Sequence, residues 1–243
     1  MIEDALNKAR EEDNSLVTEV GVELRHPELN LEEYYLNVAH DPYFKFLSIF
    51  RHHIHAISNA YFSDVVKARH MDLFLITSSV SSPSGPGSDS EPIALTFGGH
   101  NTYLTDSSQF GFEPVLIGGI PRAYCYLASM RGEDPDKRHL NQFYHCEYEA
   151  QGNFVEAQKV AEGYVRALAS LICVMPNLIS IISYNKSATI EIANQGEKHL
   201  LKILKATSPI WLTELYRDRV PFYQKPLSSN TDLALTADLL APS

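Results

Sequence analysis

The order of apolar and polar residues predicts two long amphipathic helices. In residues 43–62 apolar side chains recur every three to four positions, which is the spacing of one helix face, and Asp41-Pro42 precedes the first turn. Residues 153–175 repeat this pattern, and Pro176 stops it because proline cannot donate the helical hydrogen bond. The expected apolar stripes are Phe46, Ile49, Phe50, His53, Ile54, Ile57 and Tyr61 in the first helix, and Val155, Val160, Tyr164, Leu168, Leu171 and Ile172 in the second.

Shorter helices are predicted between and around these two. Asn30 is a candidate N-cap for one of them, and Gly118-Gly119 ends another. A capping pattern at Ser208 favours a helix that starts there. The expected short helices are residues 5–12, 29–38, 109–117, 196–206 and 208–215.

Period-two patterns and turn residues predict strands. The glycine pair Gly98-Gly99 favours a hairpin across residues 93–105. A longer hairpin is expected from residues 123–131 and 139–149, with a charged turn at 132–137. Further strands are expected at 71–76, 220–225 and 231–240. Together with the helices, these strands indicate an α+β fold, a mostly antiparallel β-sheet flanked by helices.

The second strand of the longer hairpin carries unusual chemistry. Its alternation places His139, Asn141, Phe143, His145 and Glu147 on one face, which is too polar for a core. An arginine, Arg131, ends the first strand. A cation, an aromatic ring and a carboxylate on one surface can hold a phosphate, a base and an amino group or metal, so this hairpin is a candidate nucleotide site.

Composition limits the classes of protein that fit. The chain has 243 residues, 44% of them hydrophobic, so we expect one main domain, residues 41–243, with an N-terminal extension, residues 1–40. A net charge of -10 argues against a protein that coats nucleic acid without selectivity, and we expect no DNA partner. We expect Cys125, Cys146 and Cys173 to be free thiols. We expect no membrane span and a cytoplasmic location, because apolar runs are short and the N-terminus is acidic.

Two other segments allow two interpretations each. Residues 78–92 are rich in Ser, Gly and Pro, which fits a flexible linker or a mobile loop beside a site. His52 and His55 lie three positions apart, as metal ligands on a helix can, but with no carboxylate nearby in sequence we interpret them as surface residues.

Four segments resemble the class II aminoacyl-tRNA synthetases. They are residues 97–113, the motif Arg131-Gly-Glu with Arg138-His-Leu-Asn-Gln-Phe143, the run Val220-Pro-Phe-Tyr-Gln-Lys225 and the run Ala237-Asp-Leu-Leu-Ala-Pro242. The pattern is that of the aspartyl/asparaginyl/lysyl branch, nearest to the asparaginyl type, and it covers about residues 43–243. The resemblance implies an antiparallel-sheet catalytic domain that activates an amino acid with ATP, usually as a homodimer.

The resemblance also implies roles on the ATP side. Arg131 would grip the α-phosphate and the carboxylate of the amino acid. Glu133 would accept a hydrogen bond from the adenine amino group, and Phe143 would stack on the adenine. Arg138 and His139 would meet the outer phosphates. From the residues alone, Arg131 could also be a surface arginine on a hairpin, and Phe143 could be an ordinary core residue.

Other residues carry over to the amino-acid side. Gln109 and Glu113 would hold the amino acid, although their spacing also fits a solvated helix face. Glu147 is a plausible ligand for the Mg²⁺ that accompanies ATP. Residues 81–92 take the place of the family's substrate-closing loop. His145 matches no position of the pattern, and we interpret it as structural.

Departures from the family pattern leave three hypotheses open. The region 61–76 lacks the proline of the first family motif, residues 1–40 contain no strand pattern of an anticodon-binding barrel, and the third motif would follow Ser243. We therefore expect an incomplete catalytic domain. The first hypothesis is an enzyme that activates an Asp-like or Asn-like amino acid and passes it to ammonia or a small amine. The alternatives are a truncated tRNA ligase and a non-catalytic paralogue.

Overall fold

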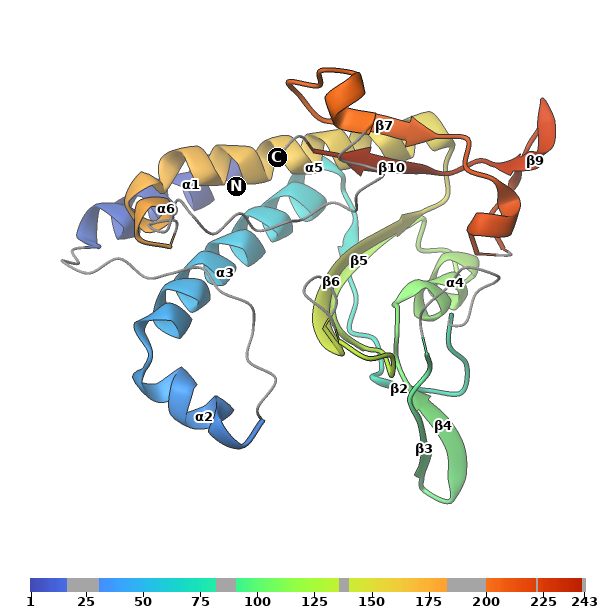
Figure 1. Ribbon diagram of the computed structural model, residues 1–243, viewed down its shortest axis with the longest axis horizontal. Coiled ribbons are helices and arrows are strands. Elements are labelled where there is room, and N and C mark those ends of the chain that lie inside the picture. The colour runs from blue at the N-terminus through green and yellow to red at the C-terminus, as the bar shows by residue number, and fades with distance from the viewer. Residues whose placement is uncertain (17–30, 82–90, 136–139, 183–199, 222, 242–243) are drawn as a thin grey trace. The chain divides into compact units, whose positions relative to one another are not determined.

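Two compact units make up the chain. One contains Met1–His70 and Val155–Thr189, and the other Met71–Phe154 and Ile190–Ser243. The boundary expected at residue 40 is a different division, and it stays a prediction. The computed structural model describes residues 1–16, 31–81, 91–135, 140–182, 200–221 and 223–241 (Figure 1).

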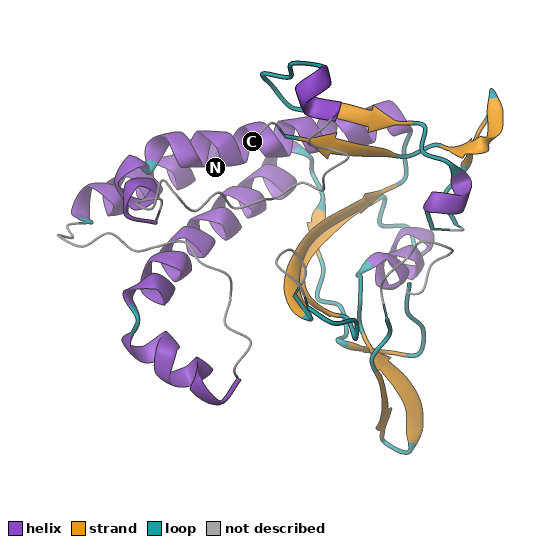
Figure 2. Ribbon diagram, in the orientation of Figure 1, coloured by secondary structure: helices purple, strands orange, loops and turns teal. Residues whose placement is uncertain are grey.

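The first unit is almost entirely helical (Figure 2). Both long helices form as expected, and Asp41 caps the first by accepting a hydrogen bond from the backbone N–H of Tyr43 at 2.9 Å. The elements are α1 (Ile2–Ser15), α2 (Leu31–His40), α3 (Pro42–Ala60), the π-helical turn η1 (Tyr61–Val65), β1 (Arg69–His70), α5 (Phe154–Val174) and α6 (Pro176–Ile182).

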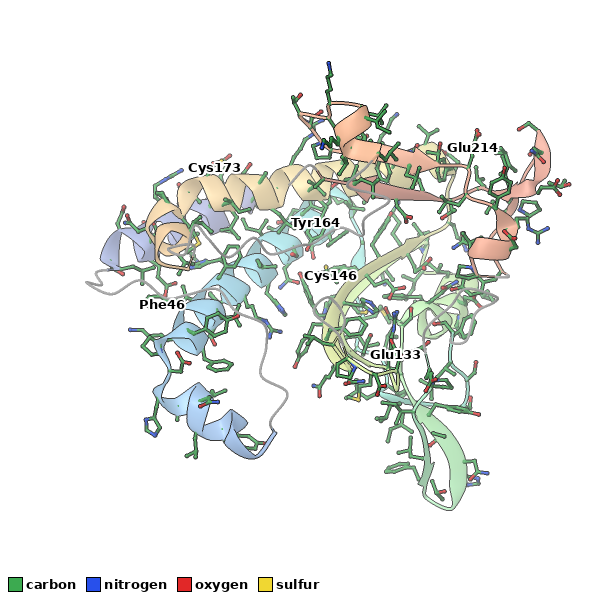
Figure 3. All side chains as sticks on the ribbon, viewed as in Figure 1. Phe46, Glu133, Cys146, Tyr164, Cys173 and Glu214 are labelled. Atoms are coloured by element: carbon green, nitrogen blue, oxygen red, sulfur yellow. The ribbon has the colours of Figure 1, made fainter. Side chains whose placement is uncertain are left out.

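Hydrogen bonds between aromatic and small residues join α3 and η1 to α5. The hydroxyl group of Tyr164, which is labelled in Figure 3, lies 2.7 Å from that of Ser58. The Tyr61 hydroxyl donates to the Val160 carbonyl at 2.8 Å. A Cβ atom on Gly163 would lie 2.2 Å from the Tyr61 hydroxyl oxygen, so a larger residue there would force the Tyr61 side chain to move. These contacts fix the pairing of the two helices.

The C-terminal turn of α1 is tied to α3 and α6 through two acidic residues. Glu12 lies 2.7 Å from Nε2 of His53, which is buried. Asp13 is 1% exposed, and its carboxylate accepts hydrogen bonds from the backbone N–H groups of Asn177 at 3.1 Å and Leu178 at 2.7 Å. A buried carboxylate is stable only when such donors satisfy it, so α6 and α1 stabilise each other.

The second unit contains the helix α4, short helical turns and nearly all of the described strands, and its strands pair antiparallel. The pairs β3–β4 and β5–β6 are hairpins, β2 pairs with β4, β7 pairs with β10, and β8 pairs with β9. The elements are β2 (Ile76–Thr77), β3 (Ala94–Phe97), β4 (His100–Leu104), α4 (Gln109–Ile117), β5 (Arg122–Met130), β6 (Gln142–Ala150), β7 (Ile210–Thr213), η2 (Arg217–Arg219), β8 (Pro226–Leu227), β9 (Asn230–Ala234) and β10 (Ala237–Leu240).

Helix α4 lies on one face of the β5–β6 hairpin (Figure 1). Phe112 of α4 is fully buried against Ala123, Cys125 and Leu127 of β5. This small core holds the helix on the half of the face that β5 contributes. The bounds of α4 and the β3–β4 hairpin confirm the sequence predictions for residues 109–117 and 93–105.

Three predicted elements are wrong. Residues 71–75 form no strand, and Phe74 is 87% exposed. Residues 210–213 form β7 instead of a helix, because Ile-Trp-Leu-Thr suits a strand and its pairing with β10 outweighs the capping pattern. Residues 220–225 contain no strand among those described, since β8 begins only at Pro226.

Some details of the predicted helices and strands also differ. β6 begins at Gln142, later than the expected residue 139. The expected stripe of α5 is wrong at Val155 and Ile172, which are 55% and 48% exposed. Among the described helices, none is both long and apolar enough to cross a membrane.

Candidate functional site

The candidate site lies on the face of the β5–β6 hairpin that carries α4. The register pairs Ser129 with Phe143, and two residues further along each strand it pairs Leu127 with His145. Cys125 and Glu147 are the next pair on this face. Because alternate residues share a face, β5 contributes mainly apolar side chains and β6 the aromatic and polar ones.

A cation and two rings form one end of this face. The Cζ atom of Arg131 lies 5.1 Å from the centre of the Phe143 ring. The Nε atom of Arg131 is buried and has no hydrogen-bond partner among the described residues. The Phe143 and His145 rings meet nearly at right angles, with centres 4.8 Å apart, and Nδ1 of His145 lies 2.8 Å from the Ser129 hydroxyl.

The backbone around Arg131 is fixed by pairing beyond the strand ends. The Arg131 N–H donates to the Asn141 carbonyl at 2.9 Å, and the Asn141 side-chain amide donates back to the Arg131 carbonyl at 3.0 Å. The orphaned Nε is therefore on a residue whose main chain is rigidly held. A buried donor without a partner is costly, which makes Arg131 a strong candidate for an anion-binding group.

Glu147 is held at the start of α4. Its carboxylate accepts hydrogen bonds from the Ser108 N–H at 3.1 Å, from the Ser107 hydroxyl at 3.3 Å and from the Ser108 hydroxyl. The first turn of a helix favours a negative charge at this position. These serines were not predicted as site residues. They lie in the Asp106-Ser-Ser-Gln run at which the helix begins.

The prediction that Glu147 binds magnesium stays a prediction. Its carboxylate oxygens accept hydrogen bonds, and the described part of the chain contains no group of three His, Cys, Asp or Glu side chains arranged to hold a metal. Beside a nucleotide, phosphate oxygens and water supply most of the ligands of Mg²⁺.

Carboxylates gather at the other end of the face. Burial, with the charges of Glu147 and Glu113, raises the pKa of Glu149 to about 7. Burial and the nearby charges of Asp106, Glu147, Glu149 and Glu113 raise the pKa of Tyr223. This end of the site is therefore negative, whereas Arg131 makes the other end positive. Such a surface can bind a ligand with a cationic or amide group at one end and an anion at the other.

His145 lies between the two ends. Burial lowers its pKa, the charge of Arg131 lowers it further, and the carboxylates of Glu147 and Asp106 act in the opposite direction. His145 belongs to no family motif and was therefore interpreted as structural. The strand alternation alone placed it on this face, and that signal was sufficient to find it.

The other predicted site residues lie around this hairpin. Glu133, which is labelled in Figure 3, accepts a hydrogen bond from the Glu91 N–H at 2.9 Å. The Gly132 N–H donates to the Glu91 carbonyl at 2.7 Å. Gln109 is half-buried and Glu113 is exposed, one turn apart on α4. The predicted phosphate contacts at positions 138 and 139 lie outside the described residues.

The face of the β5–β6 hairpin thus combines the helix α4, a guanidinium beside a phenylalanine ring and, at the opposite end, a group of carboxylates. The family model of the tRNA synthetases class II (D, K and N) matches residues 27–243. The chain belongs to this family.

Comparisons with individual proteins agree with the family. A probable cytoplasmic asparagine–tRNA ligase of Encephalitozoon cuniculi is 24% identical over 186 residues, which cover 61% of this chain and 41% of that protein. The asparaginyl-tRNA synthetase of Pyrococcus horikoshii, solved with asparaginyl-adenylate, superimposes with a TM-score of 0.71 at 16% identity, covering 90% of this chain and 56% of that one. The Entamoeba histolytica asparaginyl-tRNA synthetase gives a TM-score of 0.68 at 17% identity, covering 88% and 54%.

These matches show the α+β fold expected from the sequence. The chain spans less than half the length of the curated relative and just over half the length of the solved chains.

Proposed function

We propose that this chain binds ATP and an Asp-like or Asn-like amino acid and joins them as an aminoacyl-adenylate. The observation that carries the proposal is the Arg131 guanidinium beside the Phe143 ring. Its buried Nε has no hydrogen-bond partner among the described residues, and the opposite end of the face is acidic. Relatives of this family are named as ligases of asparagine, and one was solved with asparaginyl-adenylate.

The reaction requires a cation at the α-phosphate. The carboxylate oxygen of the amino acid attacks the α-phosphorus, an O–P bond forms, and the bond to the β-phosphate breaks as pyrophosphate leaves. Negative charge grows on the α-phosphate oxygens, and a guanidinium that binds two oxygens at once stabilises it. Arg131 is the residue that we assign to this role and to the substrate carboxylate.

The adenine side of the site would use the turn of the hairpin. Phe143 would stack on the base. Adenine either stacks on the face of the Phe143 ring opposite the Arg131 guanidinium or displaces the guanidinium from the ring. Glu133 would accept a hydrogen bond from the adenine amino group, in exchange for the bond it now accepts from Glu91. Arg138 and His139 are proposed contacts of the outer phosphates. Magnesium would neutralise those phosphates when it is bound with ATP.

The amino-acid side would use α4 and the acidic end of β6. Gln109 and Glu113 are proposed to hold the ammonium group. The carboxylates that raise the pKa of Glu149 give this end the negative charge that an ammonium group requires. Positioning both substrates in line on one rigid hairpin is the other large contribution to the rate.

The acceptor of the activated amino acid is a separate part of the proposal. The formal net charge of -10 is unfavourable for binding a polyanion, which supports ammonia or a small amine as the acceptor. The alternative acceptor is tRNA. We further propose a cytoplasmic homodimer, as the family resemblance implies.

Amino-acid-dependent exchange of labelled pyrophosphate into ATP tests the activation step. We expect exchange with asparagine or aspartate, and Arg131→Ala should slow it by about 10²–10³-fold, as loss of a group that stabilises transition-state charge does. Arg166→Ala is the matched control, because Arg166 is an exposed arginine of α5 in the other unit. Absence of exchange with every common amino acid would refute the proposal.

A transfer assay separates the acceptors. The adenylate formed from labelled amino acid is offered in parallel to ammonia, to small amines and to total tRNA. Label in the amide formed with ammonia or with a small amine supports the first acceptor class. Label in precipitable tRNA supports the alternative.

A further inference from the structure

A buried serine of β5, Ser129, is hydrogen-bonded to a side chain of the candidate site. Ser129 is completely buried, and on its strand face it is preceded by Ala123, Cys125 and Leu127. A hydroxyl group in such apolar surroundings is costly unless it is hydrogen-bonded. The Ser129 hydroxyl lies 2.8 Å from Nδ1 of His145, and this bond makes the buried serine favourable.

The register explains why a serine stands at this position. Ser129 lies directly opposite Phe143, and His145 lies on the diagonal of the same strand pair. A small residue opposite Phe143 leaves room for its ring, and the diagonal spacing brings the hydroxyl within reach of the imidazole. A larger apolar residue would fill the space but could not hold the histidine.

The imidazole in turn fixes the phenylalanine. The rings of Phe143 and His145 are inclined at 84°, the edge-to-face arrangement that aromatic pairs prefer. The Cζ atom of the Arg131 guanidinium lies 5.1 Å from the centre of the Phe143 ring, and its Nε has no hydrogen-bond partner in the described part of the chain. Contact with the ring therefore contributes to the orientation of the guanidinium.

We infer that Ser129 is a positioning residue: its hydroxyl holds His145, His145 holds the Phe143 ring, and that ring sets the direction of the Arg131 guanidinium. The inference deepens the proposed function and rests on it, because the value of this support is a guanidinium ready for the α-phosphate. Ser129 itself touches no substrate.

The first test needs no ligand. In nuclear magnetic resonance spectra of the chain, the ring current of Phe143 should shift the Arg131 Nε–H proton, and Phe143→Leu should remove that shift and identify it. Ser129→Ala should move the proton at least halfway to its position in Phe143→Leu. Ser58→Ala is the matched control, because Ser58 is also completely buried and hydrogen-bonded to a ring, but in the other unit, and it should move nothing.

Calorimetric titration with ATP is the second test. Ser129→Ala should weaken binding about fivefold, which is the factor that one hydrogen bond of about 1 kcal/mol gives, and Ser58→Ala should not. If Ser129→Ala leaves the Arg131 proton at its wild-type position, or if Ser58→Ala weakens ATP binding equally, the inference is wrong. If the wild-type chain binds no ATP, the proposed function fails, and the proton shift still decides the support of Arg131 by Ser129.

Discussion

Replacement of Glu149 by glutamine should stabilise the second unit at neutral and alkaline pH and leave its stability unchanged in acid. Glu149 has a pKa of about 7 in the folded protein, against an ordinary value of 4.5. Burial is the main cause, and the charges of Glu147 and Glu113 add to it. Glutamine keeps the shape of the protonated side chain and cannot acquire the charge.

The sign follows from the raised pKa. Between pH 4.5 and 7 the folded protein keeps a proton on Glu149 that the unfolded chain has already released. The stability that this proton contributes is complete below about pH 4.5 and is lost as the pH rises through about 7. One pKa unit corresponds to about 1.4 kcal/mol, so the upper limit is about 3 kcal/mol, and the partial exposure of the side chain reduces it to about 1–3 kcal/mol.

Urea unfolding at a series of pH values measures the effect. The chain has a single tryptophan, Trp211, which lies on β7 of the same unit, so its fluorescence follows that unit. The difference in unfolding free energy between Glu149→Gln and wild type should grow from near zero at pH 4 to about 1–3 kcal/mol at pH 8. Glu113→Gln removes one of the charges that raise the pKa of Glu149. In that variant the stability that the Glu149 proton contributes should therefore be lost at a lower pH than in wild type.

Glu214→Gln is the control, because Glu214 is an exposed glutamate of the same unit. Its difference from wild type should stay flat with pH. A flat difference for Glu149→Gln as well, or a destabilisation at pH 8, would contradict the raised pKa and the acidic end of the site.

Three further substitutions test the fold and the site. Gly163→Ala should destabilise the first unit by about 1–3 kcal/mol in thermal unfolding, because its Cβ would lie 2.2 Å from the Tyr61 hydroxyl oxygen, and Tyr61→Phe should recover part of that loss in the double variant. Asp13→Ala should lower the free energy of unfolding by about 2 kcal/mol, because the N–H groups of Asn177 and the buried Leu178 lose their acceptor; unchanged stability would mean that water replaces the carboxylate. Phe143→Leu should weaken ATP binding by about 1–3 kcal/mol in calorimetry, and unchanged affinity would exclude stacking of adenine on this ring.

The periodic parts of the fold were predictable from the sequence. The α3 pattern, the Gly98-Gly99 turn and the α4 bounds depend on local spacing and turn chemistry, and each is confirmed. Where a distant partner decides the structure, local reasoning failed. The strand β7 forms because β10 pairs with it, and the residues near position 208 do not indicate that pairing.

The candidate site shows the same division. Alternation along β6 correctly grouped Phe143, His145 and Glu147, since the two-residue period is local. It could not show that Ser108 donates hydrogen bonds to the Glu147 carboxylate or that Arg131 lies over Phe143, because these contacts join separate elements. The family resemblance supplied roles for residues but not their present hydrogen-bond partners.

The hydrogen bonds between Asp13 and the start of α6 have a consequence for synthesis of the protein. Asp13 and Asn177 are 164 residues apart in the chain. At about 5–20 residues per second, a ribosome needs about 10–30 s to make that interval, during which the carboxylate has no α6 to receive it. Residues 71–154 of the other unit are made in between and themselves await residues from 190 onward. Neither unit can therefore close before these later residues are made, and until then water must satisfy the Asp13 carboxylate.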